Sequence, residues 1–148
     1  MAGDDDLIRL YSQRILALAA DIPLTDRLAS PQITVRKRAP LCGSTVTVDL
    51  ALEDDRIVAF GQDVKACALG QASASILAAH VLGRSGSEIA TLREQLKAML
   101  KSGGPVPSAP FGDYEVLLPA RDYRNRHASI LLALDATLDA IGQTSRAA

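Results

Sequence analysis

Hydrophobic residues recur along this chain with two different spacings, and the change of spacing divides it into segments. Three aspartates, residues 4–6, are followed by apolar residues at helical intervals: Leu7, Ile8, Tyr11, Ile15 and Leu18. Acidic residues before such a pattern predict an amphipathic helix within residues 1–22, which ends before Pro23. Residues 24–32 show no clear period and are expected to form a connector.

Apolar and polar residues alternate from Ile33 to Val64, which is the spacing of half-buried strands. The alternation predicts three antiparallel strands within residues 33–66, arranged as a β-meander. Two registers are open for the second hairpin. A two-residue loop opposes Val46 with Asp63. A three-residue loop, 54–56, pairs apolar residues instead and is preferred for that reason: Val46 with Val64, Leu50 with Phe60 and Leu52 with Val58.

Helical spacing returns at Cys67. A first helix is expected to reach about Leu82 and to end at Gly83. Ser85 and Glu88 fit a capping box that starts a second helix, so that residues 67–101 hold two helices. A Gly- and Pro-rich arm precedes the last helix, 125–142, whose expected buried face is formed by Ile130, Leu131, Leu134, Leu138 and Ile141. This order predicts an α+β fold, a three-stranded antiparallel β-meander with helices packed on one face, in a single domain spanning 1–148.

Composition narrows the class of protein. The 148 residues carry a formal net charge of −1, 3% aromatic residues and no Trp, which argues against nucleic acid as a partner. Apolar runs are too short to span a membrane. The acidic N-terminus does not resemble a secretory signal, so we expect a cytoplasmic protein. Two cysteines in a reducing compartment are expected to be free thiols or metal ligands.

The predicted hairpin brings the two cysteines to one end of the sheet. In the preferred register Gly43 lies opposite Cys67 and Cys42 lies diagonal to it, about 7–8 Å away; the other register opposes the cysteines at about 5 Å. Zinc–thiolate bonds of about 2.3 Å would bridge such a gap. The stretch "KACALGQASASIL", 65–77, is rich in small residues, which are expected to let the helix pack closely on the sheet while the thiol stays accessible. The competing interpretation is a pair of small buried hydrophobic residues.

Residues 39–89 and "LPARDYRNRHASILLALDA", 118–136, resemble the U-type iron–sulfur cluster assembly scaffolds (IscU, the N-terminal domain of NifU, and SufU). In that family a Cys-Gly-Asp loop precedes two strands, and a second Cys opens a helix rich in Ala and Ser. Cys42-Gly43 and Cys67 match these sites. The resemblance implies a SufE/NifU-like fold and a scaffold, not an enzyme, that assembles a transferable iron–sulfur cluster and often binds zinc when isolated. The implied partners are a cysteine desulfurase and cluster-accepting proteins.

Two positions depart from the family. Ser44 replaces the acidic residue after Cys-Gly, and Ala128 replaces a third cysteine at the start of the last helix. His127 matches a histidine of the IscU branch, so Cys42, Cys67 and His127 are the predicted metal ligands. Basic residues near the same end predict an electropositive rim: Arg36, Arg38, Lys65, Arg124 and Arg126. His80, in an apolar context, is interpreted as structural.

Three functions remain open. The first is a scaffold or carrier for iron, a [2Fe–2S] cluster or zinc; because that cluster usually takes four ligands, two cysteines from each of two chains would complete the set in a homo-oligomer. The second is a sulfur acceptor of the SufE type that uses Cys42. The third is an interaction module that has lost cluster binding. No Ser/His/Asp arrangement and no phosphate-binding Gly-rich loop supports catalysis.

Overall fold

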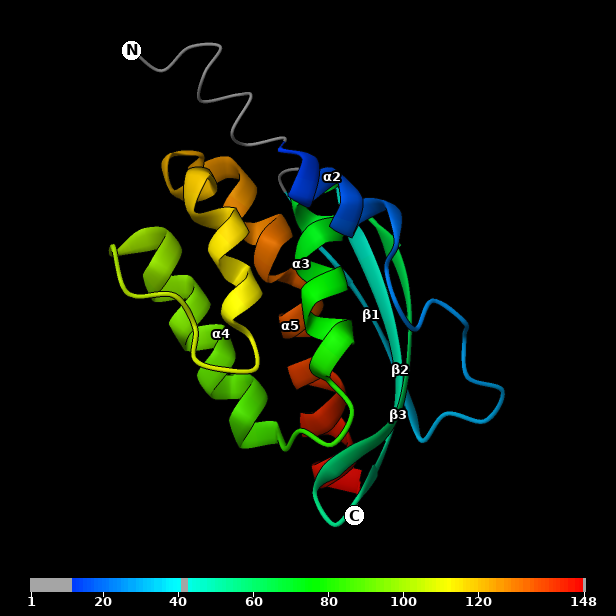
Figure 1. Ribbon diagram of the computed structural model, residues 1–148. Coiled ribbons are helices and arrows are strands. Elements are labelled where there is room, and N and C mark those ends of the chain that lie inside the picture. Colours follow the sequence, from blue (N-terminus) through cyan, green and yellow to red (C-terminus); the bar gives the residue numbers. More distant parts are fainter. Residues whose placement is uncertain (1–11, 41–42, 148) are drawn as a thin grey trace.

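A computed structural model of the chain describes residues 12–40 and 43–147. Within these ranges, helices cover one face of a sheet built from three strands, β1 (Ile33–Arg38), β2 (Thr45–Glu53) and β3 (Arg56–Lys65) (Figure 1). The strands are antiparallel and their spatial order is β1-β2-β3. The predicted α+β fold with a β-meander is therefore confirmed.

The β2–β3 hairpin combines the two registers that the sequence left open. Val46 faces Val64 and Leu50 faces Phe60, as the three-residue loop predicted. Leu52, however, faces Ile57 instead of Val58, because the register shifts between Ala51 and Leu52. The turn itself has two residues, Asp54 and Asp55, both with positive φ (51° and 63°). Asp tolerates this left-handed conformation better than most residues, and a shift of one residue is what a β-bulge produces.

Helices α3 and α4 lie close to their predicted positions, whereas the described part of the first helix begins only at Gln13. In α2 (Gln13–Ala20) the Ser12 hydroxyl accepts the amide of Ile15; the first half of the predicted helix 1–22 lies outside the described residues. Helix α3 (Ala68–His80) follows Cys67 at its N-cap, and α4 (Gly86–Lys101) is capped by Ser85, which accepts the Glu88 amide at 3.2 Å. Helix α5 (Arg124–Ala147) is longer than the predicted 125–142. The sequence did not predict η1, the 3₁₀ segment Gly112–Asp122.

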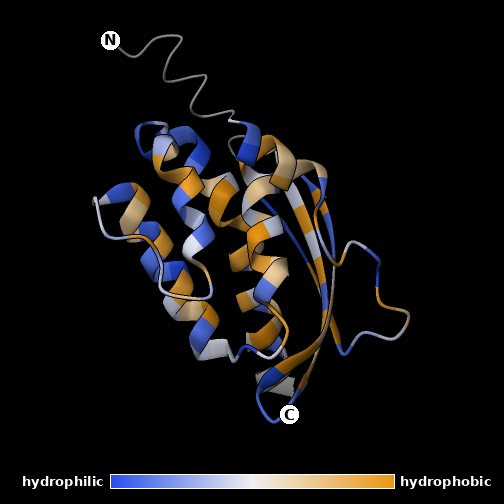
Figure 2. Cartoon of the chain, viewed as in Figure 1, coloured by the Kyte–Doolittle hydropathy of each residue, from blue (hydrophilic) through white to orange (hydrophobic). Residues whose placement is uncertain are grey.

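Helix α5 lies against β1 and β2 and also against α3 and α4, so it forms the centre of the core. Of its five predicted core residues, Ile130, Leu131 and Leu134 are buried, and Leu138 and Ile141 pack partly buried against the core. Along the strands, hydrophobic and hydrophilic segments alternate, as expected for a sheet with one face on the core (Figure 2). Helix α3 packs mainly against α2 and α5 rather than on the sheet. The sequence predicted that the small residues of this helix would pack closely on the sheet. In the structure their close contact is with helix α5 instead.

The connector between α2 and β1 crosses the sheet face that the helices leave open (Figure 1). It is held by Asp49 of β2, whose fully buried carboxylate accepts hydrogen bonds from the Arg27 guanidinium (2.5 and 3.0 Å), the Leu28 amide (3.1 Å) and the Thr34 hydroxyl (2.6 Å). A side chain at Gly61 of β3 would meet the Asp26 carbonyl oxygen at 2.4 Å, so glycine permits this close passage. The connector thus covers part of the second face without forming a layer of regular structure.

None of the helices in the described part of the chain combines the length and the apolar character that a membrane span requires.

Candidate functional site

Cys67 stands where β3 ends and α3 begins, at the end of the sheet that the register predicted. Its thiol is free and half-buried. Together with Gly43, Ser44, Lys65, Ala66 and Arg126 it lines an open hollow of about 260 Å³. Gly43 directly follows Cys42, which itself lies outside the described residues. The last observed pair of the hairpin, Thr45 with Lys65, belongs to the register that sets Gly43 opposite Cys67.

The environment of the thiol favours its charged form. Partial burial raises the pKa of Cys67, but hydrogen bonds from the Ser129 hydroxyl, the backbone amides of Gly70 and Leu69, and the Arg126 side chain outweigh that effect, so the pKa lies below its ordinary value. The two amides belong to the first turn of α3, whose N–H groups have no partner within the helix. A thiolate is both the nucleophilic form of cysteine and the form that binds metals.

Helix α5 supplies a hydroxyl that contacts the sulfur. The Ser129 hydroxyl oxygen lies 3.5 Å from the Cys67 sulfur and 3.1 Å from the Ser44 hydroxyl oxygen. Both serines are buried, with 2% and 5% of their surface exposed. An added Cβ at Gly70 would lie 2.5 Å from the Ser129 hydroxyl oxygen, so glycine lets α3 and α5 approach closely at this point. Sequence reasoning missed Ser129, although it lies one helical turn after Arg126, on the same face of α5.

In the described structure, the predicted ligand His127 does not line the hollow that contains Cys67. The His127 ring is buried, its Nε2 lies 2.9 Å from the Ala120 carbonyl oxygen, and it lines a separate hollow with Lys101 and Arg124. A carbonyl oxygen only accepts, so Nε2 carries the proton. Nδ1 is buried without a hydrogen-bond partner among the described residues. The role of His127 as a third ligand stays a prediction that this arrangement does not favour.

Ala128, which the sequence resemblance places at the family's third cysteine, is exposed on α5, whereas its neighbour Ser129 faces the thiol. Successive helix positions differ by about 100°, so a shift of one residue decides which side chain reaches the site. Within the described part of the chain, no group of three or more His, Cys, Asp and Glu side chains is arranged to hold a metal ion.

The five residues of the predicted electropositive rim do not all lie at the Cys67 hollow. Arg38, Thr45 and Lys65 form one rung across the three strands, and Lys65 and Arg126 line the hollow at Cys67. Arg36 lies one rung further along the same strand face, two residues away, where the rung ends at Asp63. Arg124 lines the His127 hollow instead. The described residues around the Cys67 hollow include no carboxylate, which leaves its charge positive.

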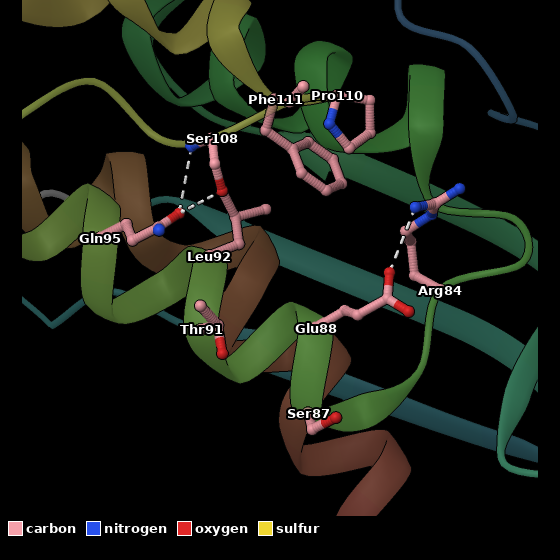
Figure 3. Close-up of a pocket in the computed structure, with 10 residues that line it drawn as sticks. Arg84, Ser87, Glu88, Thr91, Leu92, Gln95, Ser108, Pro110 and Phe111 are labelled. Atoms are coloured by element: carbon pink, nitrogen blue, oxygen red, sulfur yellow. Dashed lines mark hydrogen bonds and ion pairs between the residues drawn. The ribbon is translucent and has the colours of Figure 1, made fainter.

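A further hollow, of about 200 Å³, lies between α4 and residues 108–111, and its described lining shares no residue with that of the Cys67 hollow. Figure 3 shows Phe111 between two polar pairs: Gln95 with Ser108, and Glu88 with Arg84. His80, predicted to be structural, packs edge-to-face on Phe111 with ring centroids 5.9 Å apart. The described lining of this hollow includes no predicted site residue.

The fold and the site together define an α+β protein that presents an accessible, thiolate-favouring cysteine where a helix begins at the end of a three-stranded sheet. The fold matches the crystal structure of the nitrogen-fixing NifU-like protein (N-terminal) from Brucella abortus with a TM-score of 0.93 and 41% sequence identity, over 97% of this chain and 99% of that chain. The chain therefore belongs to the family of NifU-like N-terminal proteins, as the sequence resemblance predicted.

Two other structures share the fold at lower identity. A putative iron–sulfur cluster assembly scaffold protein for the SUF system from Fervidobacterium islandicum AW-1 matches with a TM-score of 0.79 and 18% identity, over 90% of this chain and 98% of that chain. A hypothetical protein matches with a TM-score of 0.77 and 21% identity, over 91% and 98%. No family model and no curated protein matches the sequence.

Proposed function

We propose that this protein holds iron, as an iron–sulfur cluster under assembly, on the thiolates of Cys67 and Cys42, and that it passes the cluster to acceptor proteins. The observation that carries the proposal is the setting of Cys67: an accessible sulfur, a lowered pKa, and a hollow that it shares with Gly43 and Ser44, the residues that follow Cys42. Membership in a scaffold family supports the same function.

The chemistry asked of the site is binding and release rather than catalysis. Thiolates are the usual ligands of iron–sulfur clusters, and zinc would occupy the same ligands in protein isolated without iron. The positive surroundings, Lys65 and Arg126, offset the negative charge that two thiolates and bound sulfide bring to the hollow. The same cations give an acidic surface of a cysteine desulfurase or a cluster acceptor a place to dock.

Anaerobic metal analysis tests this function. Protein purified without oxygen and reconstituted with ferrous iron and sulfide is expected to retain both, with the visible absorption of a cluster. Cys67→Ala and Cys42→Ala are each expected to abolish retention, because the cluster would lose half of the thiolates that one chain supplies. Wild-type protein that folds normally but retains no metal would contradict the scaffold function and leave the sulfur acceptor and the interaction module as the alternatives.

The lowered pKa of Cys67 also favours a second candidate, a sulfur acceptor, with Cys67 joining Cys42 as the reactive residue. In this reaction a thiolate attacks the outer sulfur of the persulfide on a cysteine desulfurase. The sulfur–sulfur bond breaks, the enzyme thiolate leaves, and the persulfide moves to the acceptor. Incubation with a desulfurase and free cysteine, followed by alkylation and mass spectrometry, detects a persulfide on the chain. A parallel sample with added ferrous iron and a reductant, which converts persulfide sulfur to sulfide, is analysed for bound iron and sulfide. Persulfide without bound iron supports the acceptor, and bound iron with sulfide supports the scaffold.

A further inference from the structure

We propose that Ser129 is a positioning residue for Cys67: its hydroxyl donates a hydrogen bond to the sulfur when that sulfur holds iron, and the Ser44 hydroxyl donates in turn to Ser129. This inference rests on the proposed cluster-binding function. Its basis is a chain of three side chains from three segments, with 3.5 Å between the Cys67 sulfur and the Ser129 oxygen and 3.1 Å between the two serine oxygens.

The direction of the chain follows from the chemistry of the sulfur. A thiolate or an iron-bound sulfur has no proton, so at this contact the Ser129 hydroxyl has to be the donor. A hydroxyl has one proton, so Ser129 can only accept from Ser44, which therefore donates. Metal binding at Cys67 thus orients two hydroxyls, one of which lies two residues after Cys42.

The packing holds the serines in place without a metal. Gly70 permits α3 to approach the Ser129 hydroxyl closely, and the burial of both serines keeps water from competing for their hydrogen bonds. Side-chain oxygens that are fixed before binding lose little entropy when the metal arrives. The adjacent position, Ala128, is exposed and does not share this contact.

Hydrogen bonds to ligand sulfur withdraw electron density from it and are among the factors that set the reduction potential of an iron–sulfur cluster. Ser44 stands where the family has an acidic residue, and its hydroxyl is a poor metal ligand. In this arrangement it instead donates a hydrogen bond to Ser129. The expected consequence is a cluster with a higher potential than the same thiolates alone would give.

The test uses the full chain, reconstituted anaerobically with ferrous iron and sulfide. In Ser129→Ala we expect the cluster's reduction potential to fall and its sulfur-to-iron charge-transfer bands to move to longer wavelength. Ser44→Ala should shift both in the same direction by a smaller amount, because it removes only the outer hydrogen bond. Ser73→Ala is the matched control. Ser73 is a buried serine in the same α3–α5 interface, and its hydroxyl donates to the Ile130 carbonyl at 2.6 Å. It should reduce thermal stability without either shift.

The outcomes separate the inference from the proposed function. Wild type that takes up a cluster while Ser129→Ala keeps the same potential and spectrum would overturn the inference alone. A shift of equal size in Ser73→Ala would also overturn it, because the effect would then come from general loosening of the interface. Wild type that takes up no cluster overturns the proposed function together with the inference. Thermal melting of each variant shows whether it is folded.

Discussion

Cys67 combines access and reactivity because its thiol is only partly buried while hydrogen-bond donors contact its sulfur. The thiolate is the reacting form, so a lowered pKa increases the reactive fraction at pH 7. We expect Cys67 in the folded chain to react with iodoacetamide with a half-maximal rate at a lower pH than the same cysteine in the unfolded chain. Rates measured by peptide mass spectrometry across pH check this for each cysteine separately.

Two comparisons make the alkylation experiment decisive. Arg126→Gln removes a cation that lines the hollow and is expected to move the midpoint back upward. The same chain unfolded in guanidinium chloride provides the unperturbed thiol. A folded midpoint equal to or above the unfolded one would contradict the thiolate-favouring environment.

Asp49 is a second residue whose charge is fixed by its surroundings. The Arg27 hydrogen bond, aided by those of Thr34 and the Leu28 amide, lowers the pKa of Asp49 against the opposing effect of burial. Asp49→Ala would leave the Leu28 and Thr34 donors without their acceptor, so we expect the free energy of unfolding to fall by about 2–4 kcal/mol at pH 7. Urea unfolding measures it, and Asp63→Ala, an exposed carboxylate of β3, should change it by less than about 0.5 kcal/mol.

The sign of the pH dependence follows from the lowered pKa of Asp49. A group whose pKa is lower in the folded state contributes stability above its unfolded pKa of about 3.9, and this contribution is lost as the pH falls through the folded value. The difference between wild type and Asp49→Ala should therefore be full at pH 7 and shrink below about pH 4. A difference that stays constant down to pH 3 would mean that the carboxylate's charge contributes nothing.

At the residue level, the sequence could predict Cys67 but not its partner. A cysteine between a strand and a small-residue helix is visible in the sequence, and so is the register that places it at the end of the sheet. Ser129 is not, because which of the neighbouring positions of α5 faces the thiol depends on how that helix is rotated against α3. Helix rotation is set by packing, here by the contact at Gly70.

Among the elements, periodicity predicted the strands and most helices because each has one buried face. It failed where local geometry departs from the regular period. The Asp54–Asp55 turn and the bulge at Ala51/Leu52 compensate for each other, so the register was right near Thr45 and wrong near the turn. The connector itself was predicted, but its path across the sheet was not, because that path depends on a buried carboxylate in β2, Asp49, and on Gly61 in β3.

The α3–α5 contact is the element-scale feature on which the site depends. Gly70→Ala would place a Cβ 2.5 Å from the Ser129 hydroxyl oxygen and 3.1 Å from its carbonyl oxygen, which requires the helices to separate. Overpacking costs up to about 3 kcal/mol, and the better helix propensity of Ala returns about 1 kcal/mol, so we expect a net loss of about 2 kcal/mol. Thermal or urea unfolding measures the loss, and alkylation should show a slower Cys67 at pH 7. Gly112→Ala, which meets nothing within 4 Å, is the control and should leave both unchanged.

On the scale of the whole molecule, charge is distributed unevenly although it nearly cancels. The chain has a formal net charge of −1, yet cations gather at the Cys67 end, and the described lining of that hollow lacks carboxylates. Antiparallel pairing and the α3–α5 contact bring residues 43–44, 65–67 and 126–129 to this end from distant parts of the chain. The result is a rim suited to anionic groups, whether thiolates, sulfide or acidic partners.

The number of cysteines sets the expected assembly of the loaded protein. A [2Fe–2S] cluster takes four protein ligands, and this chain has two cysteines, with Ser44 and Ala128 at the other family positions. Because Cys67 is accessible at an open hollow, a second copy can approach it. We therefore expect cluster uptake to convert single chains into pairs that share one cluster, with an iron-to-chain ratio of one.

Light scattering after anaerobic size exclusion measures the mass of the loaded protein, and iron analysis of each peak measures the iron-to-chain ratio. A chelator should return the mass to that of the apo chain. A loaded single chain with two irons would show that ligands beyond the two cysteines, such as His127, complete the cluster.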